Sequence, residues 1–241
     1  MDKIILKISN DFSFGYGTNK LFSSKTDMLF EKGKIYGIYG SNGTGKSSLL
    51  NILNAFIVPS SGTIEYNFSN GIFLFNKNLN KNTINIISNN IRRCFQTPLL
   101  VDELSILDNI IIGKRKYNRE KFINSFHYKQ ENKNEYINDL LEILKINPND
   151  TADKLSYGQR RIIANLQVLN TSPELILLDE PFSGLHFDAI QLFKNEYLKK
   201  VSSGATIILV EHLLTNLKDF ANDYLLIKNK KLKFDNNVGI N

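Results

Sequence analysis

The stretch that decides the fold is Gly40-Ser41-Asn42-Gly43-Thr44-Gly45-Lys46-Ser47, which matches the pattern GxxxxGK[ST] in full. Its glycines let the main chain bend so that successive N–H groups point inward, toward the oxygens of a phosphate group. From this pattern we expect Lys46 to reach the β- and γ-phosphates of a nucleotide. The hydroxyl of Ser47 is expected to bind Mg²⁺.

The sequence on either side gives this loop the context that it needs. Residues 34–39 are β-prone and predict a strand, and a helix is predicted over 46–56 because its leucines fall on one face. A strand, a glycine-rich turn and a helix in that order begin a nucleotide-binding α/β unit. The loop alone leaves the class of protein open, since GTPases, kinases and many ATPases share it.

Two acidic residues follow an apolar strand predicted over 174–178. Asp179 is expected to hold Mg²⁺, usually through water, next to Ser47. Glu180 is expected to orient or deprotonate the water that attacks the γ-phosphate. Adjacent acids at a strand end also occur on ordinary surfaces, and it is their pairing with the phosphate loop that indicates a hydrolytic site.

The hydrophobic pattern of the remaining chain predicts an α/β fold. Strands and helices alternate, which favours a mostly parallel sheet with helices on both faces. Further strands are predicted over 4–9, 62–66, 71–75, 206–210, 224–227 and 231–234, and helices over 104–112, 119–126, 134–145, 159–169 and 189–201. Gly15-Tyr16-Gly17 is interpreted as a turn, and no element is predicted for the Asn-rich residues 76–92. Residues 97–155 are interpreted as a helical insertion with a polar loop over 117–134.

Composition and charge exclude fewer classes of function than the motifs do. The 241 residues carry a net charge of +6, and the basic clusters at 114–116 and 228–233 are interpreted as solvated surface. The single cysteine, Cys94, excludes an internal disulfide and fits a reducing cytosol. The longest apolar runs, 175–178 and 206–210, are far too short to cross a bilayer. A membrane span would therefore have to come from another chain.

A further motif lies shortly before the acid pair and reads Leu155-Ser156-Tyr157-Gly158-Gln159. It resembles the LSGGQ signature of ABC (ATP-binding cassette) ATPases, with Tyr157 in place of the first glycine. Ser156, the N–H of Gly158 and the N-terminus of the following helix form a second anion site. In the family this site completes the ATP pocket of a partner subunit, so the resemblance implies that two cassettes enclose two ATP molecules head to tail.

Other positions match the family in its order along the chain. Gln96 resembles the Q-loop glutamine, which senses Mg²⁺ and the attacking water and leads into the helical subdomain. His212 resembles the switch histidine that contacts the γ-phosphate. Tyr16 stands where the family places an aromatic residue that stacks on adenine, and Phe14 is the alternative. The segment Ser183-Gly184-Leu185-His186 occupies the family's D-loop and ends in His186, where many members have an acid or Asn.

The resemblance implies a site that binds ATP and Mg²⁺. Its nucleotide-binding residues are expected to be Tyr16, Gly40, Ser41, Asn42, Gly43, Thr44, Gly45, Lys46, Ser47, Ser48, Ser156, Gly158 and Gln159. Its metal-binding residues are expected to be Ser47, Gln96 and Asp179, and its catalytic residues Lys46, Gln96, Glu180 and His212. No main catalytic position of the family is lost, so we expect an active ATPase.

The resemblance covers nearly the whole chain and implies one ABC ATPase domain over 1–241. The expected architecture is a P-loop NTPase core with a parallel-rich sheet, an N-terminal antiparallel β part and a helical subdomain inserted at about 97–155.

The subfamily is indicated by residues 93–98 with 104–110, residues 155–161 and Val210-Glu211-His212, which are similar to the ATPases of branched-chain amino acid importers. The same features occur in lipopolysaccharide-export ATPases, so the substrate, the direction of transport and the identity of the permease stay open. The resemblance implies a motor subunit bound peripherally at the cytoplasmic face of the plasma membrane. Its expected partners are a second ABC ATPase subunit, as a copy or a paralogue, and integral permease subunits, with no nucleic acid.

The alternative is a soluble ABC ATPase without a transport role, such as an assembly or repair factor. Repair and chromosome members carry long coiled coils, and translation members carry two cassettes. Neither feature is seen in this sequence, whereas a single-cassette assembly ATPase stays open.

Overall fold

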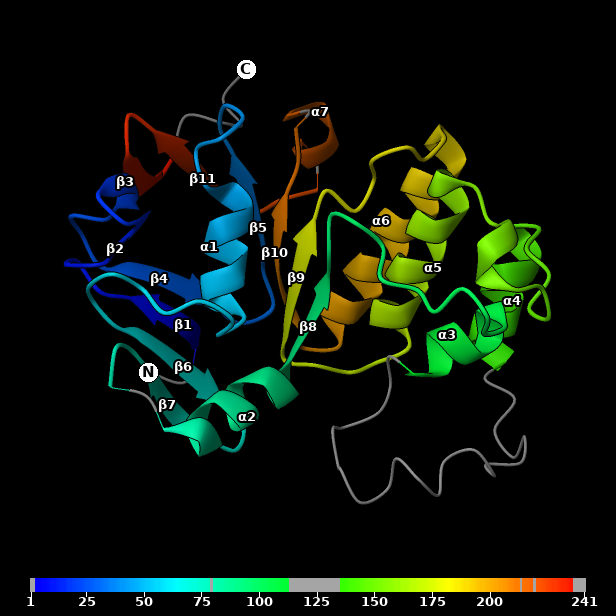
Figure 1. Ribbon diagram of the computed structural model, residues 1–241, viewed down its shortest axis with the longest axis horizontal. Helices are drawn as coiled ribbons and strands as arrows, with labels where there is room; N and C mark the ends of the chain where they lie inside the picture. Colours follow the sequence, from blue (N-terminus) through cyan, green and yellow to red (C-terminus); the bar gives the residue numbers. More distant parts are fainter. Residues whose placement is uncertain (1–2, 79, 113–134, 213, 219, 236–241) are drawn as a thin grey trace.

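The computed structural model describes residues 3–78, 80–112, 135–212, 214–218 and 220–235, which form two sheets with helices around them (Figure 1). The strands are β1 (Ile4–Ile8), β2 (Ser13–Tyr16), β3 (Asn19–Ser23), β4 (Met28–Glu31), β5 (Ile35–Tyr39), β6 (Ile64–Phe68), β7 (Gly71–Phe75), β8 (Ile91–Cys94), β9 (Leu175–Asp179), β10 (Thr206–Val210), β11 (Asp223–Lys228) and β12 (Lys231–Phe234). The helices are α1 (Lys46–Leu53), α2 (Lys81–Asn90), α3 (Ile106–Ile112), α4 (Glu135–Ile143), α5 (Tyr157–Leu169), α6 (Phe187–Ser202) and α7 (Leu214–Leu217), with a 3₁₀ turn at Ala152–Lys154.

The larger sheet has eight strands in the order β2-β3-β12-β11-β5-β10-β9-β8. Its central strands, from β11 to β8, all run parallel to one another. Parallel neighbours need long crossover connections, and helices such as α6, between β9 and β10, supply them. The predicted α/β fold with a parallel-rich sheet is confirmed.

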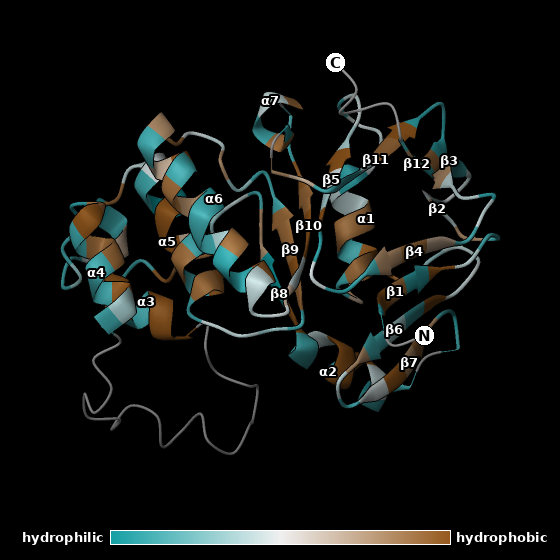
Figure 2. Cartoon of the chain, turned by 180° about the vertical axis from the view of Figure 1, so that it is seen from behind, coloured by the Kyte–Doolittle hydropathy of each residue, from teal (hydrophilic) through white to brown (hydrophobic). Residues whose placement is uncertain are grey.

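The central strands are buried on both faces. Along β9, Leu175 and Leu177 pack into the core cluster that includes Leu50 of α1, whereas Ile176 and Leu178 pack into the cluster on the opposite face. Such two-sided burial is typical of parallel strands covered by helices. Figure 2 shows β9 and β10 as hydrophobic along their length. Both strands are therefore held firmly in place by packing.

The smaller sheet is antiparallel and has the order β4-β1-β6-β7. Alternate residues of β6, beginning with Ile64, point into the same core cluster as α1. The buried hydroxyl of Tyr66 donates a hydrogen bond to the carbonyl of Leu53 at 2.9 Å and so ties this sheet to the end of α1. The expected N-terminal antiparallel part is present.

Several predicted boundaries were wrong. Gly15 and Tyr16 lie within β2, and the bend comes only at Gly17, whose φ is 56°. The strand predicted over 62–66 runs from Ile64 to Phe68, and the helix predicted over 46–56 ends at Leu53. Residues 76–92, for which no element was predicted, contain α2 and the start of β8.

The helices α3, α4, α5 and α6 lie together beyond the β8 edge of the sheet (Figure 1). The helical insertion predicted over 97–155 contains α3 and α4, and its limits stay a prediction. The basic cluster at 114–116, the helix predicted over 119–126 and the polar loop predicted over 117–134 lie outside the described residues. Within the described ranges, no helix is long and apolar enough to cross a membrane.

Candidate functional site

Four neighbouring parallel strands deliver the predicted site residues to one edge of the large sheet. β5 runs into Gly40, β8 into the segment of Gln96, β9 into Asp179 and Glu180, and β10 into the segment of His212. Ligands of open α/β sheets bind at this carboxyl edge. The topology alone therefore brings these segments together.

The phosphate loop depends on glycine at its two ends. Gly40 has a φ of 154°, and a Cβ atom there would lie 2.6 Å from the carbonyl oxygen of Ile227 on β11. Gly45 has a φ of 96°, and a Cβ atom there would lie 2.8 Å from the ring of Phe22. Since α1 begins at Lys46, the loop places the N-terminus of a helix at its own mouth. This end of a helix is a favourable place for an anion.

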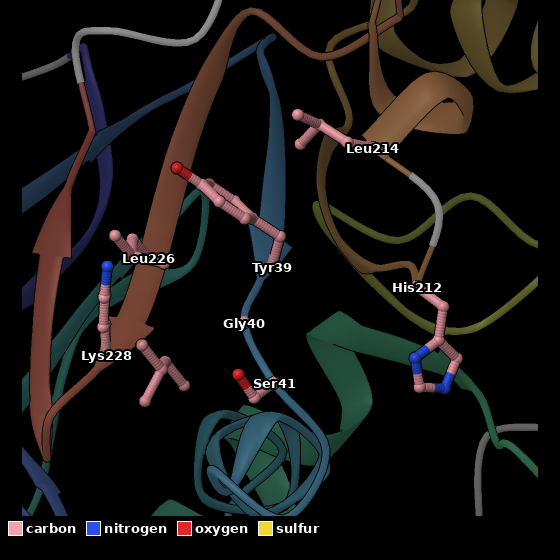
Figure 3. A pocket seen from close by; sticks show the side chains of 8 residues that line it. Tyr39, Gly40, Ser41, His212, Leu214, Leu226 and Lys228 are labelled. Carbon is pink, nitrogen blue, oxygen red and sulfur yellow. The ribbon is translucent and has the colours of Figure 1, made fainter.

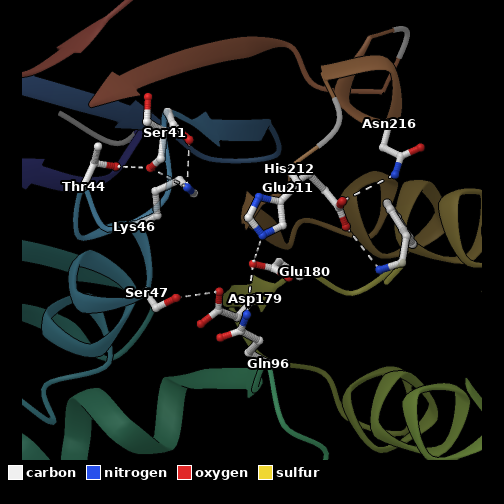
Figure 4. A network of polar contacts seen from close by, with 12 residues as sticks. Ser41, Thr44, Lys46, Ser47, Gln96, Asp179, Glu180, Glu211, His212 and Asn216 are labelled. Carbon is white, nitrogen blue, oxygen red and sulfur yellow. Dashed lines mark hydrogen bonds and ion pairs between the residues drawn. The ribbon is translucent and has the colours of Figure 1, made fainter. Parts of the chain in front are cut away.

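Lys46 spans the loop (Figure 4). Its buried ammonium group donates hydrogen bonds to the carbonyls of Gly40 at 2.8 Å and Ser41 at 3.1 Å. Burial lowers the pKa of Lys46, and the nearby Glu180 and Asp179 carboxylates act against this effect. The lysine charge is therefore held by loop carbonyls, at the place where the sequence predicts phosphate oxygens.

Asp179 is almost fully buried and has a partner on each oxygen. The hydroxyl of Ser47 donates to Oδ1 at 3.1 Å, and Arg93 Nη2 donates to Oδ2 at 3.1 Å. Arg93 also donates to the Asn51 side chain of α1 at 2.5 Å. Burial raises the pKa of Asp179, whereas the charge of Arg93 and the Ser47 hydrogen bond act to lower it. These contacts join α1, β8 and β9 around one carboxylate.

The Glu180 carboxylate contacts two further predicted site residues. Gln96 Nε2 donates to Glu180 Oε1 at 3.1 Å, and His212 Nε2 lies 2.7 Å from the same oxygen (Figure 4). Glu180 has a φ of 52°, a left-handed conformation that costs a non-glycine residue about 1 kcal/mol or more. The main chain is bent at the point where the carboxylate must leave the strand to reach these partners.

Sequence reasoning missed Arg93, Asn51 and Glu211. Glu211 is buried, and it accepts hydrogen bonds from the N–H of Phe182 at 3.2 Å and from Asn216 at 3.4 Å (Figure 4). Burial raises its pKa. For Arg93 and Glu211 the available signal was a charge within a short apolar segment, since a buried charge needs a partner; Asn51 is neutral and gave no such signal. The identity of that partner depends on strand order, which sequence does not show.

The predicted magnesium ligands fit that ion only in part. Within the described residues, no group of three or more His, Cys, Asp or Glu side chains could hold a metal. Ser47 and Asp179 together offer one hydroxyl and one carboxylate, which suits Mg²⁺ because it keeps several waters and shares the phosphate oxygens of its substrate. Gln96 contacts Glu180 rather than this pair.

The two adenine-stacking candidates differ clearly in exposure. Phe14 is 3% exposed and belongs to the core, whereas Tyr16 is 56% exposed. The Tyr16 hydroxyl lies 3.5 Å from the Ser48 hydroxyl on α1, close to the phosphate loop. Only Tyr16 therefore presents an accessible ring at the site.

The signature segment forms the start of α5. Ser156 accepts a hydrogen bond from the N–H of Gln159 at 3.3 Å, and the Gln159 side chain accepts one from the N–H of Ser156 at 2.9 Å, which together form a capping box. A Cβ atom on Gly158 would lie 2.9 Å from the carbonyl oxygen of Gly184. This turn contacts the D-loop rather than the phosphate loop of its own chain. His186 is exposed and precedes α6.

A cavity of about 350 Å³ opens beside the phosphate loop (Figure 3). It is lined by Tyr39, Gly40, Ser41, His212, Leu214, Leu226, Ile227 and Lys228. The phosphate loop and His212 therefore share one solvent-accessible space.

Residues 24–183 match the family described as ABC transporter. The chain belongs to the ABC transporter family. The probable branched-chain amino acid transport ATP-binding protein LivG of Methanocaldococcus jannaschii is 31% identical over 191 residues, which cover 76% of this chain and 71% of LivG. The cytochrome c biogenesis ATP-binding export protein CcmA of Reclinomonas americana is 28% identical over 93% of each chain.

Among solved structures, a nucleotide-free ATP-binding cassette from an ABC transporter has a TM-score of 0.73 at 25% identity, and the match covers 95% of this chain and 89% of that one. The resemblance to the ABC ATPases and the predicted fold are thus confirmed, and the chain is an ABC ATPase. The individual roles of its site residues stay predictions.

The Arg93–Asp179 ion pair predicts a pH-dependent loss of stability in Arg93→Met. Breaking a buried pair costs about 3–5 kcal/mol, because the remaining charge has no partner. Without Arg93 the pKa of Asp179 rises further, so the deficit is full above this folded-state pKa and shrinks as falling pH protonates Asp179. Urea unfolding of both proteins between about pH 8 and about pH 5 measures the difference.

The control is Arg93→Met combined with Asp179→Asn. The double variant lacks the buried charge, so it should recover part of the lost stability and lose the pH dependence. A deficit in Arg93→Met that is equal at every pH and unchanged by Asp179→Asn would contradict the assignment.

Proposed function

We propose that this chain is the ATP-hydrolysing subunit of an ABC transporter, that it pairs with a second ABC ATPase subunit around two ATP molecules, and that it drives an integral membrane permease. The observation that carries the proposal is the convergence of Gln96 and His212 on one oxygen of Glu180, beside the phosphate loop. A merely nucleotide-binding protein needs the loop, whereas hydrolysis also needs a group that handles a water molecule.

Binding of the ATP phosphates and of Mg²⁺ is assigned to different residues of the site. On ATP binding, Lys46 exchanges the carbonyls of Gly40 and Ser41 for phosphate oxygens, and the loop N–H groups hold the remaining charge. Ser47 and Asp179, which are joined by a hydrogen bond, would hold Mg²⁺, and the ion would supply electrostatic stabilisation of the phosphate charge.

Glu180 orients the attacking water and accepts its proton. Gln96 and His212 keep the Glu180 carboxylate in one orientation before the reaction begins. Since His212 also lines the cavity beside Gly40 and Ser41, it is close to the place where a γ-phosphate would lie. Catalysis then consists of positioning and of charge stabilisation that is organised in advance.

The second ATPase subunit is proposed because one chain holds only part of each predicted site. Ser156 is exposed at the N-terminus of α5, and its turn contacts Gly184 of the D-loop and the carbonyl of Gln96. An exposed helix N-terminus suits the phosphates of an ATP held by another subunit.

The transported class is proposed to be amino acids, and the location the cytoplasmic face of the plasma membrane. The support is the 31% identity to LivG, whose name specifies branched-chain amino acid transport. CcmA, whose name specifies export, is also similar, so the direction of transport is not part of the proposal.

Tyr16→Ala should weaken ATP binding about five-fold or more, because an aromatic ring stacked on a base contributes about 1–3 kcal/mol. Tyr16→Phe keeps the ring and serves as the matched control, with binding close to that of the unaltered chain. Titration of the purified protein with ATP by calorimetry gives the dissociation constants. Equal affinities for Tyr16→Ala and the unaltered chain would place the adenine elsewhere.

The transporter assignment predicts where the native protein is found after cell breakage. Washing membranes with high salt removes proteins that are held by surface charge alone, which matters for a chain of net charge +6. We expect the protein to remain on the membrane and to purify in detergent together with an integral partner. Full recovery in the soluble fraction without a membrane partner would refute the permease-linked role and favour a soluble ABC ATPase.

A further inference from the structure

Arg161 is fully buried and is not among the predicted nucleotide-binding, metal-binding or catalytic residues. It lies in the second turn of α5, and by residue volume it heads the fully buried side chains of the described chain. Its Nη1 donates to the carbonyl of Phe95 at 2.6 Å, and its Nη2 donates to the carbonyl of Gln96. A planar guanidinium that holds two consecutive carbonyls restricts the orientation of the peptides on both sides of Gln96.

Tyr157 adds to this contact from the first turn of the same helix. Its hydroxyl accepts a hydrogen bond from Arg161 Nη2 at 2.7 Å and donates one to the Gln96 carbonyl at 3.4 Å. The Arg161 guanidinium also lies 5.5 Å from the centre of the Tyr157 ring. A glycine at position 157, as in the LSGGQ form of the signature, could make none of these contacts.

The same turn of α5 also touches the segment that follows Glu180. A Cβ atom on Gly184 would lie 3.2 Å from the Tyr157 ring, and one on Gly158 would lie 2.9 Å from the Gly184 carbonyl oxygen. Tyr157 is thus in contact with both Gln96 and the D-loop.

The held main chain determines where the Gln96 side chain reaches. Its amide donates to Glu180 Oε1 at 3.1 Å, and a shift of about 1 Å would take this contact beyond hydrogen-bonding distance. Displacements of this size are known to reduce catalytic rates. A contact that fixes the main chain of Gln96 therefore also controls the orientation of Glu180.

We propose that Tyr157 and Arg161 are positioning residues that hold the main chain of Gln96, so that its side-chain amide meets Glu180. Through them the signature turn, at which the second subunit would bring its nucleotide, is connected to the hydrolytic acid of its own chain. This inference rests on the proposed function for its catalytic consequence. Neither residue contacts the reacting atoms, and the contact itself exists in the single chain without nucleotide.

Two variants test the proposal in the full-length protein. Tyr157→Phe removes one hydroxyl and keeps the ring, at a position that is 52% exposed and therefore tolerant of the change. Arg161→Lys keeps the buried charge and loses the guanidinium that spans both carbonyls. Tyr136→Phe is the matched control, because its hydroxyl bonds to Glu196 on α6, away from Gln96.

Two readouts are measured for each variant. The first is hydrogen exchange of the peptide that covers residues 93–101, in the protein without nucleotide. The second is steady-state ATP hydrolysis. We expect faster exchange of this peptide in Tyr157→Phe and Arg161→Lys but not in Tyr136→Phe. We also expect kcat to fall about five-fold in Tyr157→Phe and about ten-fold or more in Arg161→Lys, with KM for ATP nearly constant.

The results distinguish a failure of this inference from a failure of the proposed function. Unchanged exchange in both variants overturns the proposal, whatever the activity. Faster exchange with an unchanged kcat shows that the contact holds the main chain without positioning Gln96, which also overturns it. If the unaltered protein does not hydrolyse ATP, the proposed function fails instead, and the exchange measurement still decides whether the contact exists. Should Arg161→Lys not fold, Tyr157→Phe alone gives the answer.

Discussion

The burial of β9 and β10 on both faces is the constraint on which the site depends. Alternate side chains of each strand enter two different core clusters, so neither strand can slide or rotate without exposing apolar surface. Their carboxyl ends are therefore fixed relative to β5 and its phosphate loop. Asp179 and Glu180 at the end of one strand, and His212 just beyond the other, are thus held by packing that lies outside the site itself.

Each charged residue of the site at the carboxyl edge of the sheet has a polar or charged partner. Asp179 is paired with Arg93 and Ser47, Glu180 with Gln96 and His212, and Lys46 with carbonyls of its own loop. A buried charge without a partner is costly, so each contact stabilises the site in the absence of nucleotide. In the proposed function, binding of ATP exchanges these partners rather than adding charge interactions where there were none.

The sequence predicted those parts of the site whose chemistry is local. The phosphate loop, the acid pair and the signature turn are each contained in a few consecutive residues, and α5, α6, β9 and β10 were located to within about two residues by their hydrophobic period. The strand β2 was missed because Gly15 and Gly17 were interpreted together as one turn. The helix α2 was missed because its segment is rich in Asn, a poor helix former, and Ile87 is the buried residue of this helix.

The rest of the site depends on contacts between distant segments. Arg93 meets Asp179 only because β8 lies beside β9, and Arg161 meets Gln96 only because α5 packs beneath the end of β8. Residue spacing does not decide between Phe14 and Tyr16, because residues two apart on a strand share a face and the two rings are in contact; the choice depends on which ring the folded chain buries. Contacts between distant segments cannot be predicted from a single sequence, which shows only that some charged residues lie in apolar surroundings.

The most direct test of the account is ATP turnover by Glu180→Gln. The variant keeps the shape of the side chain and removes the carboxylate that we propose orients water and accepts its proton. We predict that ATP binding is retained and that turnover falls about 100-fold or more, which is the usual contribution of a general base. Near-normal turnover by Glu180→Gln would contradict the assignment of the hydrolytic group and, with it, the reading of the sheet edge as a hydrolytic site.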